Sequence, residues 1–159
     1  MIDTTIYARF SECVENWPSN PAVIEDGRSY TYRQLDRMVD SIMARFYDLE
    51  PRRVGICMTH SVEMIAAMLA VLKSGAAYVP VEPSLPLERR EFMMDTASIE
   101  LIIDDNFCRG LEPVKIDMED RSMPGSPAYI LYTSGTSGQP KGVIVQNSAV
   151  VNYAEAFKE

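Results

Sequence analysis

Apolar residues recur along this chain with two different periods. In several stretches they return every three or four residues, which predicts amphipathic or buried helices. These stretches cover residues 4–17, 31–49, 61–74, 87–97 and 147–159. Between them lie short runs that are apolar throughout or alternate with polar residues, which predicts strands. A hairpin is expected within residues 22–32, and further strands at 53–58, 76–83, 99–105, 113–117, 128–133 and 142–146, of which 113–117 would be a short edge strand.

Local signals mark several of the expected boundaries. Thr31 and Gln34 have the spacing of a capping box, in which each satisfies a free amide of the other at the start of a helix. The Asp26-Gly27 pair suits a type I′ hairpin turn, because glycine accepts positive φ. Ser61 is the expected N-cap of the helix at 61–74, and Gly75 fits the position just after its end. Pro86 can open the helix at 87–97, and either Asn147 or Ser148 is the expected N-cap of the last helix.

The order of the expected elements indicates the fold class. Strands alternate with helices, and several strands carry apolar residues on both faces. This pattern favours an α/β fold with a parallel or mixed sheet that is covered by helices on both faces. The length of 159 residues fits a single domain with a sizeable core.

Composition excludes several classes of function. The net charge is −8 and basic residues do not cluster, which argues against a nucleic-acid partner. Cys13, Cys57 and Cys108 are widely spaced, and the single histidine is His60, so the sequence predicts reduced thiols in a cytoplasmic protein and no metal site. Neither a signal peptide nor an apolar run of about 18 residues is present, so no membrane association is expected.

The segment YTSGTSGQPKGV, residues 132–143, carries the candidate chemistry. Glycines allow close approach of backbone amides, hydroxyls add neutral donors, and Lys141 adds a positive charge, which together suit a phosphate chain. Its spacing differs from Walker A, since two residues separate Gly138 from the lysine. The alternative is a flexible linker, but the flanks AYILY and VIV read as buried strands, which favours a functional loop on a rigid frame.

This segment resembles the phosphate-binding signature of adenylate-forming (AMP-binding) enzymes. SYTYRQLD (29–36) and LAVLKSGAAYVPVEPSLPLERREFMMDTA (69–97) are similar to earlier motifs of that family, in the same order. AYVPVEP and YTSG are most like amino-acid-activating domains of nonribosomal peptide synthetases. The chain departs from the family pattern at Glu82, Leu85, Ser137 and Gln146-Asn147, where Asp, Tyr, Thr and a Glu-His pair are usual.

The resemblance implies a site and a reaction. Family members use ATP and Mg²⁺ to convert a carboxylate into an acyl-adenylate with release of pyrophosphate, and then transfer the acyl group to a thiol. The implied phosphate-loop residues are Thr133, Ser134, Gly135, Thr136, Ser137, Gly138, Lys141 and Gly142. Lys141 would assist phosphate binding as a mobile charge and not as a nucleophile, and no catalytic residue is assigned with it.

The family's later motifs, which supply the acyl pocket, adenine and ribose contacts, Mg²⁺ ligand and lid lysine, have no counterpart here. We therefore expect residues 1–159 to be one incomplete domain, the first part of the large N-terminal domain, which binds ATP weakly and does not complete adenylation alone. An excised fragment, half of a split enzyme, a natural truncation and a segment of a larger assembly all remain open. So do two other functions, a non-catalytic interaction module and an acyl-CoA ligase segment.

The resemblance also implies partners. They are the remainder of the enzyme, a carrier protein with a phosphopantetheine arm, and an MbtH-like protein. The last would bind a surface formed by Ser84, Leu85, Pro86, Glu88, Arg89 and Phe92. Uncovered apolar faces would also allow self-association. The methionines of the predicted helices are expected to fill the core.

Overall fold

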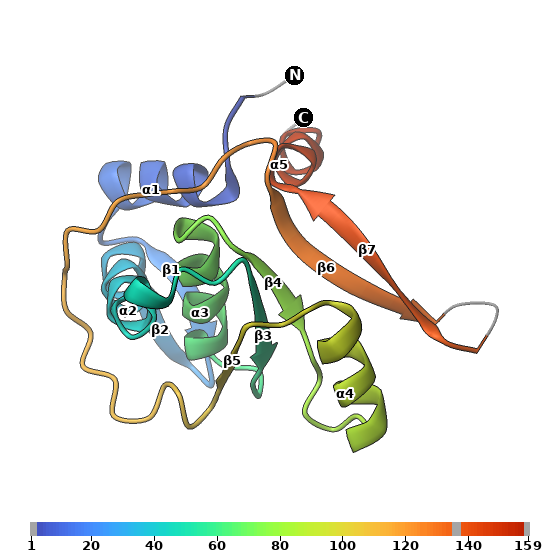
Figure 1. Ribbon diagram of the computed structural model, residues 1–159. Coiled ribbons are helices and arrows are strands. Elements are labelled where there is room, and N and C mark those ends of the chain that lie inside the picture. The colour runs from blue at the N-terminus through green and yellow to red at the C-terminus, as the bar shows by residue number, and fades with distance from the viewer. Residues whose placement is uncertain (1–2, 135–137, 158–159) are drawn as a thin grey trace.

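The computed structural model describes residues 3–134 and 138–157, which form a five-stranded sheet flanked by helices and a separate two-stranded hairpin (Figure 1). The strand order of the sheet is β5-β3-β4-β6-β7. The helices are α1 (Ile6–Asn16), α2 (Tyr32–Ala44), α3 (Val62–Lys73), α4 (Leu87–Thr96) and α5 (Asn147–Glu155), with a 3-10 turn η1 (Tyr47–Leu49). The strands are β1 (Pro21–Glu25), β2 (Arg28–Thr31), β3 (Arg53–Cys57), β4 (Ala77–Pro80), β5 (Leu101–Asp104), β6 (Pro127–Ser134) and β7 (Pro140–Gln146).

The sheet is mixed, as the sequence predicts. β3 pairs in parallel with both β4 and β5, β4 pairs in parallel with β6, and β7 runs antiparallel to β6. The chain passes through α3 to reach β4 on one side of β3, and through α4 to reach β5 on the other side. Because parallel crossovers are right-handed, the two helices lie on opposite faces of the sheet.

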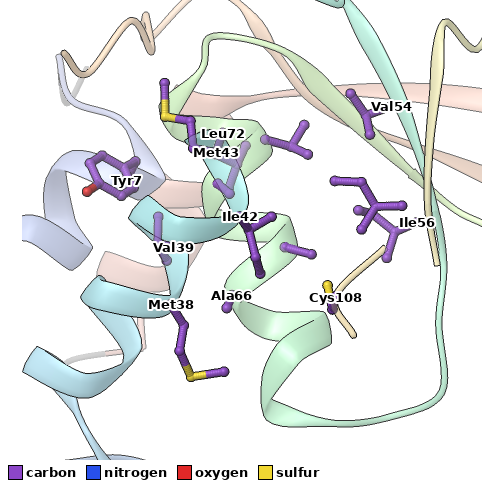
Figure 2. Close-up of a cluster of buried hydrophobic side chains, with 14 of the residues drawn as sticks. Tyr7, Met38, Val39, Ile42, Met43, Val54, Ile56, Ala66, Leu72 and Cys108 are labelled. Carbon is purple, nitrogen blue, oxygen red and sulfur yellow. The ribbon is translucent and has the colours of Figure 1, made fainter. Parts of the chain in front are cut away.

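Two apolar clusters on the two faces support this arrangement. The larger joins α1, α2 and α3 to the sheet, and Figure 2 shows Ile42 and Met43 of α2 among side chains of α3 and β3. The smaller cluster joins α4 to the sheet through Met93, Val79 and Ile130. The prediction of helices on both faces is therefore confirmed. Methionines lie in the core as expected: Met38, Met43, Met58 and Met93 are buried, and Met64, Met68 and Met94 pack against the clusters.

The expected caps and turns form largely as the sequence indicates. Thr31 and Gln34 make both hydrogen bonds of the capping box, and Ser61 accepts from the amide of Met64. The hairpin turn at Asp26-Gly27 has positive φ at both residues. Gly75, just past α3, has φ of +84°, and a Cβ there would lie 2.8 Å from the carbonyl oxygen of Arg121. Glycine is therefore required at that position on two separate grounds.

The N-cap expected for the last helix is wrong by one or two residues. α5 begins at Asn147, its N-cap is Gln146, and Gln146 makes no side-chain capping bond. Asn147 is instead buried, where its side chain accepts from the amide of Ile6 at 3.4 Å and donates to the carbonyl of Ser126 at 3.2 Å. This asparagine, at a position where the family pattern has a different residue pair, links α5 to α1 and to the preceding connection.

The predicted edge strand at residues 113–117 is also wrong. Residues 105–126 contain no helix or strand. Ser41 of α2 accepts from the amide of Val114 at 2.9 Å, and Asp40 accepts from the amide of Ile116 at 3.1 Å. Because these backbone groups bind α2 side chains, they are not available to a strand ladder.

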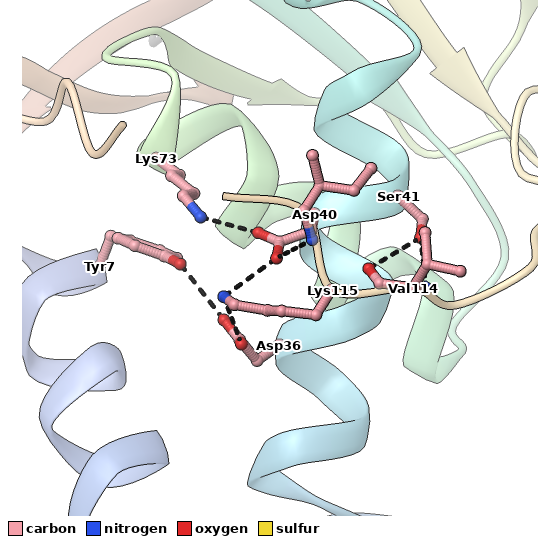
Figure 3. Close-up of polar contacts among 8 residues, drawn as sticks. Tyr7, Asp36, Asp40, Ser41, Lys73, Val114 and Lys115 are labelled. Atoms are coloured by element: carbon pink, nitrogen blue, oxygen red, sulfur yellow. Dashed lines mark hydrogen bonds and ion pairs between the residues drawn. The ribbon is translucent and has the colours of Figure 1, made fainter. Parts of the chain in front are cut away.

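A buried ionic network joins this connection to the helices. Figure 3 shows Lys73 of α3 reaching Asp40 of α2, with Lys115 between Asp40 and Asp36. The Lys73 Nζ lies 2.7 Å from Asp40, and Lys115 Nζ lies 3.0 Å from Asp40 and 2.9 Å from Asp36. The side chains of Asp40 and Lys73 are 0% and 4% exposed. Tyr7 donates to Asp36 at 3.4 Å, and burial together with the two carboxylates raises the pKa of its phenol.

Among the described residues, no helix is long and apolar enough to cross a membrane. His60 is exposed.

Candidate functional site

The candidate loop joins the last two strands of the sheet. It follows the carboxyl end of β6, and β3, β4 and β5 end at the same edge because all four strands are parallel. In open α/β sheets this edge is where ligands bind. In Figure 1 the hairpin of β6 and β7 runs from α5 away from α1, α2 and α3.

The hairpin register brings the two best candidate donors together. Thr133 lies opposite Lys141, and Ser134 lies opposite Pro140. Directly opposed residues on neighbouring strands project on the same face, so the Thr133 hydroxyl and the Lys141 ammonium share one side of the hairpin. Gly138 follows in the loop with φ of +84°.

The side chains of this pair are available to a ligand. Thr133, Ser134 and Lys141 are all exposed. Within residues 3–134 and 138–157, no hydrogen bond or ion pair engages these three side chains. A hydroxyl and an ammonium on one face, both without protein partners in the described chain, fit the donor set that a phosphate requires. The predicted site residues Gly135, Thr136 and Ser137 lie outside the described residues.

Gly142 has a packing role that the sequence did not indicate. It lies opposite Tyr132, and a Cβ at this position would be 3.1 Å from Cγ2 of Ile130 and 3.3 Å from Cζ of Tyr132. The Tyr132 ring thus occupies the space beside the glycine, on the face of the hairpin that points toward α4. The contacts of Gly142 are with the hairpin itself.

Carboxylates near the strand ends have structural partners. Asp104 accepts from the amide of Phe107 at 2.7 Å, and Asp105 accepts from the amide of Thr59 at 3.2 Å. These contacts hold the two acids at the end of β5. The described residues contain no group of three or more His, Cys, Asp or Glu that could hold a metal ion.

Two sizeable cavities lie away from Thr133 and Lys141. One, of about 570 Å³, lies at the carboxyl ends of β3 and β5 and is lined by Thr59, Asp105 and Cys108. Burial raises the pKa of the Cys108 thiol to about 11, so this group is protonated at neutral pH and is a poor nucleophile. The other, of about 560 Å³, lies at the amino ends of β3 and β4, beside Arg53 and Ala77. Neither cavity touches Thr133 or Lys141.

The predicted partner surface is partly exposed. Ser84, Pro86, Glu88 and Arg89 are exposed, whereas Leu85 and Phe92 are half-buried. Leu87, which the sequence reasoning did not select, is 60% exposed between them. Its position in the first turn of a helix that buries only Met93 is the signal that would have identified it.

The buried network of Asp36, Asp40, Lys73 and Lys115 was not predicted from the sequence. Its detectable signal is a pair of acids at i and i+4 beside the apolar stripe of α2. The partner lysines lie 33 and 75 residues beyond Asp40, so only the folded chain reveals them.

Comparison with known proteins identifies the family. The family described as AMP-binding enzyme matches residues 10–159. The chain is 33% identical over 176 residues to tyrocidine synthase 3 of Brevibacillus parabrevis, covering 99% of this chain and 3% of that protein. It is 34% identical over 175 residues to surfactin synthase subunit 2 of Bacillus subtilis (strain 168), covering 94% of this chain and 5% of that protein.

A solved structure extends the likeness to the fold. The N-terminal subdomain of Klebsiella oxytoca NpsA, in complex with 3-hydroxyanthranilyl-AMSN, superposes with a TM-score of 0.81 at 25% identity. The match covers 90% of this chain and 40% of that one, so the chain spans less than half of that subdomain and a few per cent of the peptide synthases. The chain belongs to the AMP-binding enzyme family, and within it the chain is most like the N-terminal part of a nonribosomal peptide synthetase adenylation domain.

Proposed function

We propose that this chain supplies the phosphate-binding loop of an amino-acid-activating adenylation domain. The complete domain would join ATP, with Mg²⁺, to a carboxylate, release pyrophosphate, and pass the acyl group to a carrier-protein thiol. The chain would form one incomplete domain and would need the remainder of the enzyme for turnover. The observation that carries this proposal is the exposed pair of Thr133 and Lys141, opposed across the hairpin at the carboxyl edge of the sheet.

The chemistry of the proposed step explains why donors are needed there. A carboxylate oxygen of the substrate would attack the α-phosphorus of ATP and the bond to the bridging oxygen would break, so negative charge would accumulate on the departing pyrophosphate. Lys141 would offset that charge, and Thr133 and Ser134 would donate hydrogen bonds to phosphate oxygens. Gly135, Thr136, Ser137 and Gly138 would complete the cradle, as the resemblance implies. Donors fixed on paired strands need little reorganisation when the charge develops.

The proposed location of this chemistry is the cytoplasm. The free thiols of Cys13, Cys57 and Cys108 support this proposal.

ATP–pyrophosphate exchange tests the proposal. The chain would be assayed alone and with a fragment that supplies the rest of an adenylation domain, with each amino acid in turn. We expect weak pyrophosphate binding by the chain alone and exchange only after the fragment is added. Absence of both binding and exchange, with the two parts folded and associated, would contradict the proposal. Exchange with fatty or aryl acids and CoA in place of amino acids would favour the acyl-CoA ligase alternative.

Single substitutions assign the binding to the loop. Lys141→Ala should weaken pyrophosphate binding roughly tenfold or more, the usual effect of removing one hydrogen bond to a charged group. Thr133→Val should weaken it less, and Thr133→Ser should restore it. The matched control is Arg37→Ala, which removes an exposed positive charge on α2. If Lys141→Ala and Arg37→Ala weaken pyrophosphate binding equally, binding depends on the net charge of the protein and not on the position of Lys141.

The exposed Leu87 favours a second role as a partner-binding surface. With Ser84, Pro86, Glu88 and Arg89 it forms an exposed patch around the start of α4, which would suit an MbtH-like protein or another synthetase domain. Co-purification with such a partner should be lost in Leu87→Asp and kept in Lys141→Ala. Loss in both variants would argue against a separate surface.

A further inference from the structure

Tyr132 immediately precedes the candidate donor Thr133, and the side chains of these two residues lie on opposite faces of the hairpin. Side chains alternate along a strand, so Tyr132 and Ile130 point toward α4, whereas Thr133 points to the opposite face. The Tyr132 hydroxyl lies 2.7 Å from Oγ1 of Thr96 and 3.1 Å from the carbonyl of Met93. Both atoms belong to the last turn of α4.

Thr96 and Tyr132 each have one hydroxyl proton. The Thr96 Oγ1 lies 2.6 Å from the carbonyl of Phe92, the Tyr132 hydroxyl lies 3.1 Å from the carbonyl of Met93, and both carbonyls can only accept. Either hydroxyl can therefore be the donor in the 2.7 Å contact between Tyr132 and Thr96, and in both cases this contact joins the hairpin to the last turn of α4.

The Tyr132 ring also contacts the partner strand. It lies over Gly142, where a Cβ would come within 3.3 Å of Cζ. An aromatic ring opposite a glycine on a neighbouring strand covers the glycine and pins the strand register. The same side chain therefore connects both strands of the hairpin to α4.

Little else restrains this end of the hairpin. β7 is exposed at each of residues 141–144, and Leu131 of β6 is 44% exposed. The register between β4 and β6 places Tyr78 opposite Tyr129, three residues before Tyr132. The hydrogen bonds of Tyr132 to the end of α4 thus lie two residues before the end of β6.

We propose that Tyr132 is a positioning residue for the phosphate loop, with Thr96 as its anchor. The hydrogen bond to α4 sets the orientation of the hairpin end, and that orientation sets where the Thr133 hydroxyl and the Lys141 ammonium meet a ligand. The role in catalysis rests on the proposed function, whereas the mechanical link between hairpin and helix does not. Positioning matters because donors act when they lie about 2.7–3.1 Å from the atom on which charge develops, and a misplacement of about 1 Å can cost about a hundredfold in rate.

Two independent measurements test this inference. The first is hydrogen exchange of the unliganded chain, compared among wild type, Tyr132→Phe, Thr96→Val and Thr96→Ser. We expect several-fold faster exchange of β6 and β7 amides in Tyr132→Phe and Thr96→Val, wild-type exchange in Thr96→Ser, and no change in β3. Tyr153→Phe is the control, since it removes the hydroxyl of a residue that is 69% exposed.

The second measurement is ATP–pyrophosphate exchange in the complemented protein. The KM for pyrophosphate should rise roughly two- to tenfold in Tyr132→Phe and Thr96→Val, the effect expected from one neutral hydrogen bond. The KM for the amino acid should not change. The double variant should be no worse than Tyr132→Phe, because that variant already removes the bond to Thr96 together with the bond to the Met93 carbonyl.

The outcomes separate the inference from the proposed function. Unchanged hairpin exchange in both Tyr132→Phe and Thr96→Val overturns the positioning role, and so does acceleration that spreads equally to β3. Thr96→Ser behaving as Thr96→Val also overturns it, since serine keeps the hydroxyl. If wild type fails to bind pyrophosphate while Tyr132→Phe still loosens the hairpin, the proposed function fails and the link to α4 stands.

Discussion

The three-helix side of the sheet and the β6–β7 hairpin differ in almost every physical respect. Around α2 and α3, side chains such as Ile42 and Val71 are fully buried, and even the charges of Asp40 and Lys73 are enclosed. On the hairpin, Val143 and Ile144 are about half exposed, and the charge of Lys141 faces solvent. In the first region the charged groups pair with one another, whereas in the second the Lys141 ammonium is exposed and has no ion-pair partner among the described residues. Stability and candidate chemistry therefore reside in different parts of one sheet.

The largest effect should come from breaking the buried ion pair. Asp40→Ala leaves the Lys73 ammonium without its carboxylate and frees the Ile116 amide, so we expect unfolding to become easier by about 3–5 kcal/mol in urea titrations. Replacing both members, as Asp40→Leu with Lys73→Met, should recover much of the loss. If the single variant loses less than about 1 kcal/mol, the enclosed pair contributes no more to stability than an exposed ion pair does.

The next largest effect on the free energy of unfolding should come from truncating a buried isoleucine. The same truncation on the hairpin should have little effect. Ile42→Ala removes a side chain that is 0% exposed and should cost about 2–5 kcal/mol. Ile144→Ala removes one that is 54% exposed and should change the free energy of unfolding by no more than about 0.5 kcal/mol. Similar losses for the two variants would mean that the hairpin carries more of the fold than its exposure indicates.

Tyr78 lies at the border between the two regions and packs on Tyr129 with ring centroids 5.5 Å apart. At alkaline pH the free energy of unfolding should depend on this residue. Burial, and secondarily Tyr129, raises the pKa of Tyr78 to about 12. Between about pH 10 and 12 the unfolded chain releases this proton and the folded chain keeps it, so the free energy of unfolding should fall with rising pH. The fall is at most about 1.4 kcal/mol per pH unit for one group.

Tyr78→Phe should flatten that part of the stability profile relative to wild type, because the titrating group is gone. Tyr153→Phe, which removes the hydroxyl of a highly exposed tyrosine, should leave the profile unchanged. Parallel profiles for wild type and Tyr78→Phe would contradict the assignment.

The smallest effect on stability should be at the loop itself. Lys141 is exposed and its ammonium has no ion-pair partner among the described residues, so Lys141→Ala should leave urea unfolding within about 0.5 kcal/mol of wild type. Combined with weakened pyrophosphate binding, this result would separate ligand binding from folding. Destabilisation by more than 1 kcal/mol would place the lysine in the fold and not only in the site.

Prediction from sequence succeeded where the information is local. The capping box at Thr31 and the turn at Asp26-Gly27 depend on residues within a few positions, and both form. The expected strand at 113–117 failed because local strand propensity competed with α2, whose Ser41 and Asp40 take the amides of Val114 and Ile116. No local signal reports a competition between segments about 75 residues apart.

The candidate site also combines features that depend on local sequence with features that depend on the tertiary structure. Residue types in YTSGTSGQPKGV indicate phosphate chemistry, because glycine, hydroxyl and lysine have that chemistry wherever they are placed. The pairing of Thr133 with Lys141 required the hairpin register, and the role of Tyr132 required α4 to lie beneath it. The sequence could not indicate that Gly142 would lie against a ring.

The sequence by itself determined the family, the α/β class, most element boundaries and the residue types of the candidate loop, since these depend on periodicity and on residues near one another in the chain. Only the tertiary structure decided which charges are enclosed, which strand faces remain open, and which helix contacts Tyr132 of the hairpin. Those properties depend on distances between segments such as α2 and residues 112–116, or Thr96 and Tyr132. Folding sets these distances through packing and hydrogen bonding that no short stretch of sequence contains.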